Sequence, residues 1–211
     1  MSALVWRLIL RMAHYLVSTI DLHLHLAPPE RVRNADGSYG LDLFECFTDS
    51  SHGNGEDGLG YAGVVIMTRG EGGALGWKVM LPPSGFDSTA AAELHATTVA
   101  LKYTIAIRTL QNELDLEVAP TEPTPLYTDA QAVTDGTSME RMNRGTRWLA
   151  AKYAMVRWGI ACRAIALGQV SSEDQIADIV TKAIVGARFY FLRARVLGLR
   201  PGTAGTGLDG S

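Results

Sequence analysis

LDLFECFTDSSHGNGEDGLGYAGVVIMTRGEGGALGWKVML, residues 41–81, holds three strand-like runs separated by two glycine-rich loops. The runs cover residues 41–50, 61–69 and 75–81. Strands that follow one another through short loops pair in antiparallel fashion. The stretch therefore predicts a three-stranded antiparallel meander.

Downstream of this meander the chain alternates between helical and strand patterns. Alanine-rich residues 88–111 carry apolar side chains at helical spacing, with Asp87 or Ser88 as the expected cap. This order predicts an α/β fold, in which a mixed sheet carries helices on its faces. The remaining predicted elements are a strand at 126–128, a helix that begins at 130–134, a helix at 144–158, a strand at 160–167, a helix at 172–181 opened by Ser171 or Ser172, and a helix at 187–197.

We expect one main domain, residues 41–199, with an appendage at each end. Residues 1–40 are expected to form an amphipathic helix that needs a partner, followed by a linker rich in chain-breaking residues. Residues 200–211 contain few apolar side chains and are expected to be a disordered tail. The apolar stripe of the first helix comprises Val5, Leu8, Ile9, Met12 and Leu16.

The composition is that of a globular protein without a strong overall charge. Of 211 residues, 47% are hydrophobic and 19% are charged, which is enough apolar surface to offset the entropy lost on folding. The formal net charge is −3 at pH 7, so any phosphate contact must come from a local basic patch. Arg7, Arg11 and His14 interrupt the apolar first helix, which leaves no run of the roughly 18 apolar residues that a membrane span requires.

Two cysteines and two tryptophans are expected to be buried. Cys46 and Cys162 lie far apart in apolar runs and belong to no C-x-x-C pair, which favours two reduced thiols in an intracellular protein over a disulfide or a metal site. Trp148 and Trp158 lie in the predicted helix 144–158, where a core position is favoured over a role in stacking on bases.

Four carboxylates lie where this chain order can bring them together. Asp49 ends the first strand and Asp129 ends the fourth, while Glu93 and Asp178 lie on the helices that follow the third and fifth strands. Sites in open α/β sheets gather at the carboxyl ends of strands, beside the point where the strand order reverses. Asp49 and Asp129 would then form the floor of a site.

A divalent metal site is one interpretation of this grouping. Closely spaced carboxylates repel, and a divalent cation removes that repulsion. Mg²⁺ prefers hard oxygen ligands, and two such ions about 4 Å apart can activate a water and neutralise the leaving oxygen of a phosphodiester. The alternative is structural, because Asp commonly ends strands and caps helices. Spacing alone leaves both interpretations open.

The residues around the four acids resemble the ribonuclease H domains of copia-type (Pseudoviridae) retrotransposon Pol polyproteins. The last of the matching blocks is the most specific, because it resembles the family's closing E-D-Q-x-A-D-x-x-T-K stretch almost residue for residue. Residues 6–24 and 189–199 resemble the family's reverse transcriptase connection segment and its usual ending. The matching blocks are FTDSSHG around Asp49, STAAAEL around Glu93, LYTDAQA around Asp129 and VSSEDQIADIVTK around Asp178.

The resemblance implies a ribonuclease H-like fold with a five-stranded sheet of order 3-2-1-4-5, and hydrolysis of the RNA strand of RNA–DNA hybrids. It implies two Mg²⁺ ions, with Mn²⁺ as an alternative. The implied partners are the hybrid and the reverse transcriptase part of the same polyprotein, with no membrane, at an intracellular location in the cytoplasm or a virus-like particle. The implied catalytic and metal-binding residues are Asp49, Glu93, Asp129 and Asp178.

A basic row on the predicted helix from Arg141 to Arg157 is a candidate for hybrid binding. Arg144 and Arg147 share a helix face, and with Arg141 they would track a phosphate backbone; a solvated basic face is the alternative. Where the family reads T-K-H-I-D-I-R-Y-H, residues 146–154 read T-R-W-L-A-A-K-Y-A. Lys152 survives as a like-for-like match, but the family's histidines and aspartate are missing, which would weaken substrate contact there.

Two further segments offer candidate substrate contacts. His52 and Asn54 follow Asp49 in a loop, where they would reach the minor groove or the 2′-hydroxyls of RNA, unless the loop is a plain turn. Ser88 is expected to cap the long helix, and a backbone amide beside it could also hold a phosphate.

Two other functions fit parts of the pattern. A catalytically inactive remnant that binds nucleic acid or a partner protein is suggested by the altered 146–154 stretch and the net negative charge; magnesium-dependent turnover separates it from the enzyme. Another nuclease of the same fold, such as an integrase or a Holliday-junction resolvase, uses different acid spacing. The closing E-D-Q-I-A-D block speaks against that second alternative.

Overall fold

The structure, a computed structural model, describes residues 3–26, 30–33, 39–42, 44–51, 60–70, 72–81, 88–113, 122–139 and 144–199. The predicted five-stranded mixed sheet is confirmed, with the strand order β5-β4-β3-β6-β7. When the five strands of this sheet are numbered 1 to 5 along the chain, their order is the predicted 3-2-1-4-5. The strands are β3 (Phe44–Ser51), β4 (Tyr61–Thr68), β5 (Ala74–Met80), β6 (Thr124–Thr128) and β7 (Ile165–Gln169).

The strand register brings two acid-bearing strand ends together. β3, β4 and β5 pair antiparallel, which confirms the predicted meander. β3 and β6 pair parallel, with Thr48 opposite Thr128, and β6 pairs parallel with β7. Because parallel neighbours end at the same edge of a sheet, the residues that follow Thr48 and Thr128 lie side by side.

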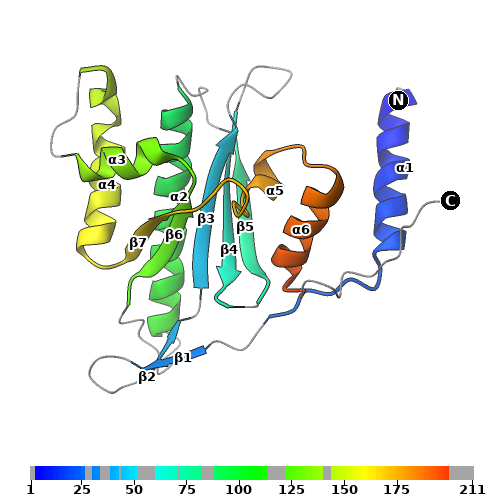
Figure 1. Cartoon of the computed structure of the whole chain (residues 1–211), viewed down its shortest axis with the longest axis horizontal. Coiled ribbons are helices and arrows are strands. Elements are labelled where there is room, and N and C mark those ends of the chain that lie inside the picture. The colour runs from blue at the N-terminus through cyan, green and yellow to red at the C-terminus, as the bar shows by residue number, and fades with distance from the viewer. Residues whose placement is uncertain are drawn as a thin grey trace.

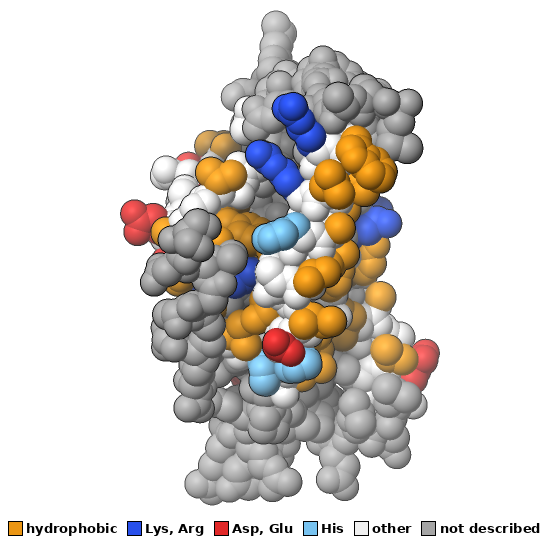
Figure 2. All heavy atoms as spheres, turned by 90° about the vertical axis from the view of Figure 1, so that its right-hand side faces the viewer, with side chains coloured by type: hydrophobic (Ala, Val, Ile, Leu, Met, Phe, Trp, Pro, Cys, Tyr) orange, Lys and Arg blue, Asp and Glu red, His pale blue; other side chains and the backbone are white. Residues whose placement is uncertain are grey.

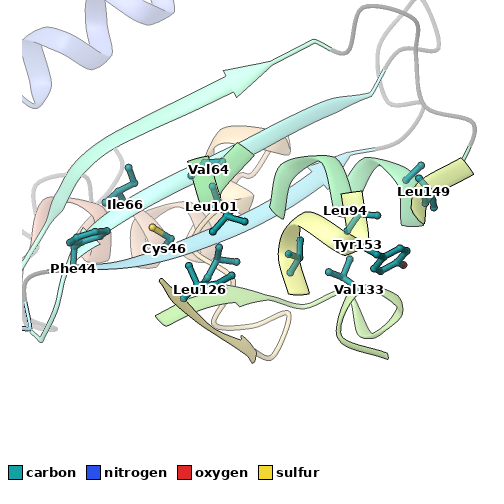
Figure 3. Close-up of a cluster of buried hydrophobic side chains, with 14 residues drawn as sticks. Phe44, Cys46, Val64, Ile66, Leu94, Leu101, Leu126, Val133, Leu149 and Tyr153 are labelled. Carbon is teal, nitrogen blue, oxygen red and sulfur yellow. The ribbon is translucent and has the colours of Figure 1, made fainter. Parts of the chain in front are cut away.

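Helices cover both faces of the sheet, as predicted (Figure 1). One face carries α2 (Thr89–Glu113), α3 (Gln131–Ser138) and α4 (Ala150–Ala161). The other carries the short α5 (Asp178–Thr181) and α6 (Gly186–Leu197). The larger core lies between the sheet and α2 with α4, where apolar side chains of β3, β4 and β6 meet those of the helices (Figure 3).

Successive side chains of β3 and β4 alternate between two cores, because neighbouring residues of a strand face opposite sides of the sheet. Phe44, Cys46, Val64 and Ile66 belong to the larger core. Phe47, Val65 and Met67 belong to a smaller core, with Ile176 and Ala177 just before α5. Asp49 has the same parity as Phe47 and so faces α5.

The N-terminal segment forms α1 (Ala3–Ser18) and a two-stranded hairpin, β1 (Glu30–Arg33) with β2 (Tyr39–Asp42). β1 and the first two residues of β2 fall within residues 27–40, the segment predicted to be a linker. α1 stands beside α6, where the rings of Tyr15 and Phe189 meet edge to face (Figure 1). Hydrophobic side chains gather along one side of α1, as predicted, and stay exposed (Figure 2).

Three predicted elements differ from those observed. The predicted helix 144–158 is a 3-10 helix η1 (Arg144–Leu149) followed by α4, which continues to Ala161. The predicted strand 160–167 was wrong in its first half, because α4 continues to Ala161 and β7 begins only at Ile165. Just after α4, Arg163 adopts a left-handed φ of 58°, a conformation that a glycine usually provides at the end of a helix. The predicted helix 172–181 is mostly turns, and only α5 is helical.

The expected burial of the cysteines and tryptophans is only partly correct. Cys46 is buried, but Cys162 is exposed because it follows the end of α4 instead of lying in a strand. Trp148 is 54% exposed and Trp158 is 56% exposed, so the prediction that they lie in the core was wrong. Among the described helices, none combines the length and the apolar character needed to cross a membrane.

Candidate metal centre

Asp49 and Asp129 lie at the adjacent ends of β3 and β6. Asp49 is buried at 1% exposure, and Asp129 is half-buried just after β6. Asp49, Glu93 and Asp129 each offer one carboxylate oxygen, and these three oxygens all lie within 4.8 Å of one another. The juxtaposition predicted from the strand ends is therefore present for three of the four acids.

Glu93 reaches this pair from α2. The helix begins as predicted, with the Ser88 hydroxyl accepting a hydrogen bond from the Ala91 amide at 3.2 Å. Glu93 Oε1 accepts a hydrogen bond from the Ser50 amide at 3.2 Å, which ties α2 to the end of β3. Its other oxygen, Oε2, is buried and has no hydrogen-bond partner in the described part of the chain. A buried oxygen in that state is a ready acceptor for a cation.

Burial makes this acidic group resist ionisation. It raises the pKa of Glu93 to about 8, and the negative charge of Asp49 raises it further against the hydrogen bond from the Ser50 amide. Burial also raises the pKa of Asp49 to about 6; the Thr181 hydroxyl and Lys182 oppose this shift, while Asp178 and Asp129 add to it. A divalent cation would stabilise the ionised forms of both groups.

Asp129 is oriented by the loop that follows β7. Ser172 Oγ donates to Asp129 Oδ2 at 3.2 Å, and Gln175 Nε2 approaches Asp129 Oδ1 at 3.4 Å. The same Gln175 nitrogen donates to the Thr48 carbonyl at 2.9 Å, and its oxygen accepts from the Ala177 amide. Gln175 is fully buried, so it fixes the loop against the strand that carries Asp49.

Asp178 joins the group through a lysine. It lies at the start of α5 and is buried. Lys182 Nζ lies 2.6 Å from Asp178 Oδ1 and 3.2 Å from Asp49 Oδ1, so one ammonium bridges the two carboxylates. Thr181 Oγ1 donates to Asp49 Oδ2. Asp178 therefore lies on the same side of the molecule as the other three acids, and Lys182 links it to Asp49.

A glycine on β4 makes room for α5 at this point. Gly63 pairs with Asp49 across the two strands. A Cβ at Gly63 would lie 2.4 Å from the Thr181 methyl carbon and 2.8 Å from a Val180 methyl carbon. Glycine thus allows the close approach that brings Thr181 to Asp49.

Arg188 of α6 explains why residues 172–177 are not helical. Its guanidinium donates hydrogen bonds to the carbonyl oxygens of Glu173 and Ser172, the latter at 2.8 Å. These carbonyl groups therefore bond to a side chain and not to the backbone amides of a helix. The same guanidinium lies 3.4 Å from Asp178 Oδ2. Arg188 therefore shapes the loop and holds the outer oxygen of Asp178.

The predicted substrate contacts are placed only in part. His52 and Asn54 lie outside the described residues, as does the side chain of Arg144. Arg147 is exposed on η1, and Lys152 Nζ lies 3.2 Å from His95 Nδ1 on α2, two residues beyond Glu93.

Sequence reasoning missed the residues that support the acids. Three of them lie inside the VSSEDQIADIVTK block that carried the resemblance, but the block did not indicate their roles: Gln175, Thr181 and Lys182. The one feature of the sequence that could have identified them is that they lie close to Asp178. Arg188 carried no such signal, because it acts from a separate helix.

Comparisons with known proteins found similar solved structures but no sequence match. No protein-family model and no curated protein sequence matches the chain. Solved structures similar to it include the N-terminal RNase H domain of a Mycobacterium tuberculosis protein (13% identity, 65% of this chain and 89% of that chain, TM-score 0.49). Others are LC11-RNase H1 in complex with an RNA/DNA hybrid (18%, 63% and 88%, 0.45) and a foamy viral protease-reverse transcriptase in complex with an RNA/DNA hybrid (13%, 69% and 20%, 0.45).

The chain has a ribonuclease H-like fold. The decisive observation is the topology itself: an antiparallel meander, two further parallel strands in the order 3-2-1-4-5, and helices on both faces. This is the fold class that the sequence predicted. In this ribonuclease H-like fold the acidic group lies at the carboxyl ends of the two central parallel strands.

Proposed function

We propose that this protein is a metal-dependent endonuclease that hydrolyses the RNA strand of RNA–DNA hybrids. The observation that carries the proposal is the convergence of Asp49, Glu93 and Asp129 at the ends of β3 and β6. Asp49 and Glu93 are buried, and Glu93 Oε2 has no hydrogen-bond partner among the described residues, which supports a cation as a ligand of this group.

The donor set fits Mg²⁺, with Mn²⁺ as an alternative, because all the offered ligand atoms are carboxylate oxygens. Asp49, Glu93 and Asp129 would hold one ion, and Asp49 with Asp178 would hold a second. Two such ions supply an activated water and neutralise the leaving oxygen in phosphodiester hydrolysis. The chain's own residues preorganise the ligands: Thr181 holds Asp49, Ser50 holds Glu93, and Ser172 with Gln175 holds Asp129.

We assign hybrid binding to the substrate contacts that the sequence predicts. Because the net charge is −3, phosphate contacts need a local basic patch. Lys152 brings a positive charge close to α2 through its contact with His95, and Arg147 is exposed on η1. Ser88 stays in the proposed set through backbone amides at the start of α2. His52, Asn54 and Arg144 complete that set.

The biological context we propose is that of the sequence resemblance. The chain would be the nuclease part of a copia-type retrotransposon Pol polyprotein, with the reverse transcriptase of the same polyprotein as a partner of α1. The exposed apolar side of α1 is consistent with such a partner (Figure 2). The location would be the cytoplasm or a virus-like particle.

A cleavage assay tests the proposal. The full chain should cut the RNA strand of a labelled hybrid in Mg²⁺ or Mn²⁺ and stop when EDTA is added, while duplex DNA and four-way junctions remain intact. Binding of the hybrid without turnover would support the inactive-remnant alternative. Cutting of junctions in preference to hybrid would identify a different nuclease of this fold.

A further inference from the structure

One cation is already present among the four acids. The ammonium group of Lys182 contacts Asp178 Oδ1 at 2.6 Å and Asp49 Oδ1 at 3.2 Å. Both acids are nearly buried, with side-chain exposures of 10% and 2%. Charge-assisted contacts of this length in a poorly solvated site are strong. The Asp49–Asp178 side of the group is thus electrically compensated, unlike the side formed by Glu93 and Asp129.

We propose that the Lys182 ammonium occupies the position of a second cation between Asp49 and Asp178. The site then takes up one divalent ion readily at Asp49, Glu93 and Asp129, and a second only when Lys182 leaves. The inference rests on the proposed function, since it concerns the ions of the same centre.

The structure allows Lys182 to leave at low cost. It lies just after α5, its side chain is 37% exposed, and its four-carbon stem is flexible. Asp49 would keep its hydrogen bond from Thr181, and Asp178 would keep Arg188 at 3.4 Å. Neither carboxylate is therefore stranded without a partner when the ammonium departs.

The charge of Lys182 also determines which of the two ion positions is filled first. Glu93 Oε2 has no competing donor among the described residues, so an ion bound there displaces no protein group. An ion between Asp49 and Asp178 must displace a positive charge at contact distance. Its binding is weakened by that competition, which we expect to reach about tenfold or more.

The experiment is a Mn²⁺ titration of the full chain, followed by calorimetry for affinity and by electron paramagnetic resonance for coupling between paired ions. The native chain should bind one ion more tightly than the second by about tenfold or more. Lys182→Met should strengthen binding of the second ion by about the same factor, with a coupled Mn²⁺ pair appearing at lower concentration. Lys182→Arg, which keeps the charge, should behave more like the native chain.

Lys78→Met is the matched control, because it removes the same charge from an exposed lysine on β5. It should leave both affinities unchanged. Thermal unfolding provides a second readout. Without metal, Lys182→Met should lower the transition temperature. Added Mn²⁺ should raise the transition temperature of Lys182→Met by more than it raises that of Lys78→Met.

The outcomes separate the two proposals. Two ions of equal affinity in the native chain, or an unchanged second affinity in Lys182→Met, would overturn the role of Lys182 even if the hybrid is cut. The native-chain titration decides alone if Lys182→Met does not fold. Absence of any ion binding, together with an intact hybrid, would instead refute the proposed function.

Discussion

The two sides of the acidic group differ in how their negative charge is balanced. On one side, Glu93 accepts a hydrogen bond from the Ser50 amide, and its Oε2 has no hydrogen-bond partner among the described residues. On the other, Asp178 contacts both Lys182 and Arg188. Asp49 belongs to both sides. The difference shows where a cation is lacking and where the chain has supplied its own.

This comparison also separates ligand geometry from ligand ionisation. The Glu93 side is geometrically ready, but burial raises the pKa of Glu93 to about 8, so at neutral pH this carboxyl is largely protonated without a cation. On the other side, Asp178 is paired with Lys182 and Arg188. Metal binding on the first side should therefore release protons, whereas on the second side it should displace an ammonium.

The largest effect is expected where the two sides meet. Asp49→Asn removes a ligand shared by both, and we expect hybrid cleavage to fall by about a hundredfold to a thousandfold, as when a main electrostatic contact in a transition state is lost. The rate is measured in single-turnover assays in Mg²⁺, with circular dichroism to verify folding. Near-native cleavage by the folded variant would contradict the assignment of the site.

Glu93→Gln should reveal the cost of the unbalanced side. At pH 8 and without divalent ions, it should raise the free energy of unfolding by roughly 2 to 4 kcal/mol, since it removes a carboxyl that ionises far more readily in the unfolded chain than in its buried place in the fold. The same variant should lose cleavage. Urea unfolding in EDTA measures the difference, and a destabilised variant at pH 8 would count against the ionisation argument.

The pH dependence follows from the same two groups. The folded-state pKa values of Asp49 (about 6) and Glu93 (about 8) lie above the ordinary 3.8 and 4.5, so the folded chain binds more protons than the unfolded one. Their contribution to stability is therefore present at low pH and is lost as pH rises toward about 8. Saturating Mg²⁺ should flatten this loss, and so should Glu93→Gln.

Gly63→Ala tests the side that the chain balances itself. The added methyl group meets Thr181 and Val180, so it should displace α5 and lower the free energy of unfolding by about 1 to 3 kcal/mol. Cleavage should fall because Asp178 and Thr181, both on α5, move away from Asp49. Gly76→Ala, at a β5 position with open space, is the control. Equal effects of the two substitutions would remove the argument for close approach.

The smallest effect is expected at the rim of the site. Ser172→Ala removes an exposed donor to Asp129, which keeps the approach of Gln175, so stability should change by less than about 1 kcal/mol. Cleavage should fall only a few-fold. A loss as large as that of Asp49→Asn would mean that the loop after β7 contributes more to the site than its contacts indicate.

The sequence predicted the sheet well because strands and their turns leave local signals. The meander and the long helix opened by Ser88 are confirmed, and so is the strand order, which the family resemblance implied. Helix ends without such signals were misplaced. α4 ends at Ala161, and Arg163 just beyond it adopts a left-handed backbone, a conformation that the sequence pattern does not predict for an arginine. The turns at 172–174 replaced a predicted helix because Arg188, distant in sequence, takes their carbonyl groups.

For the site, the four acids and their order follow from the sequence alone, because the motif around each acid is local. The pairing of parallel strand ends even predicted that Asp49 and Asp129 would be neighbours. What only the tertiary structure decided is how the charges are balanced: an unpartnered oxygen on Glu93 and a lysine between Asp49 and Asp178. Charge balance depends on burial and on distances between separate elements, and these exist only once the chain has folded.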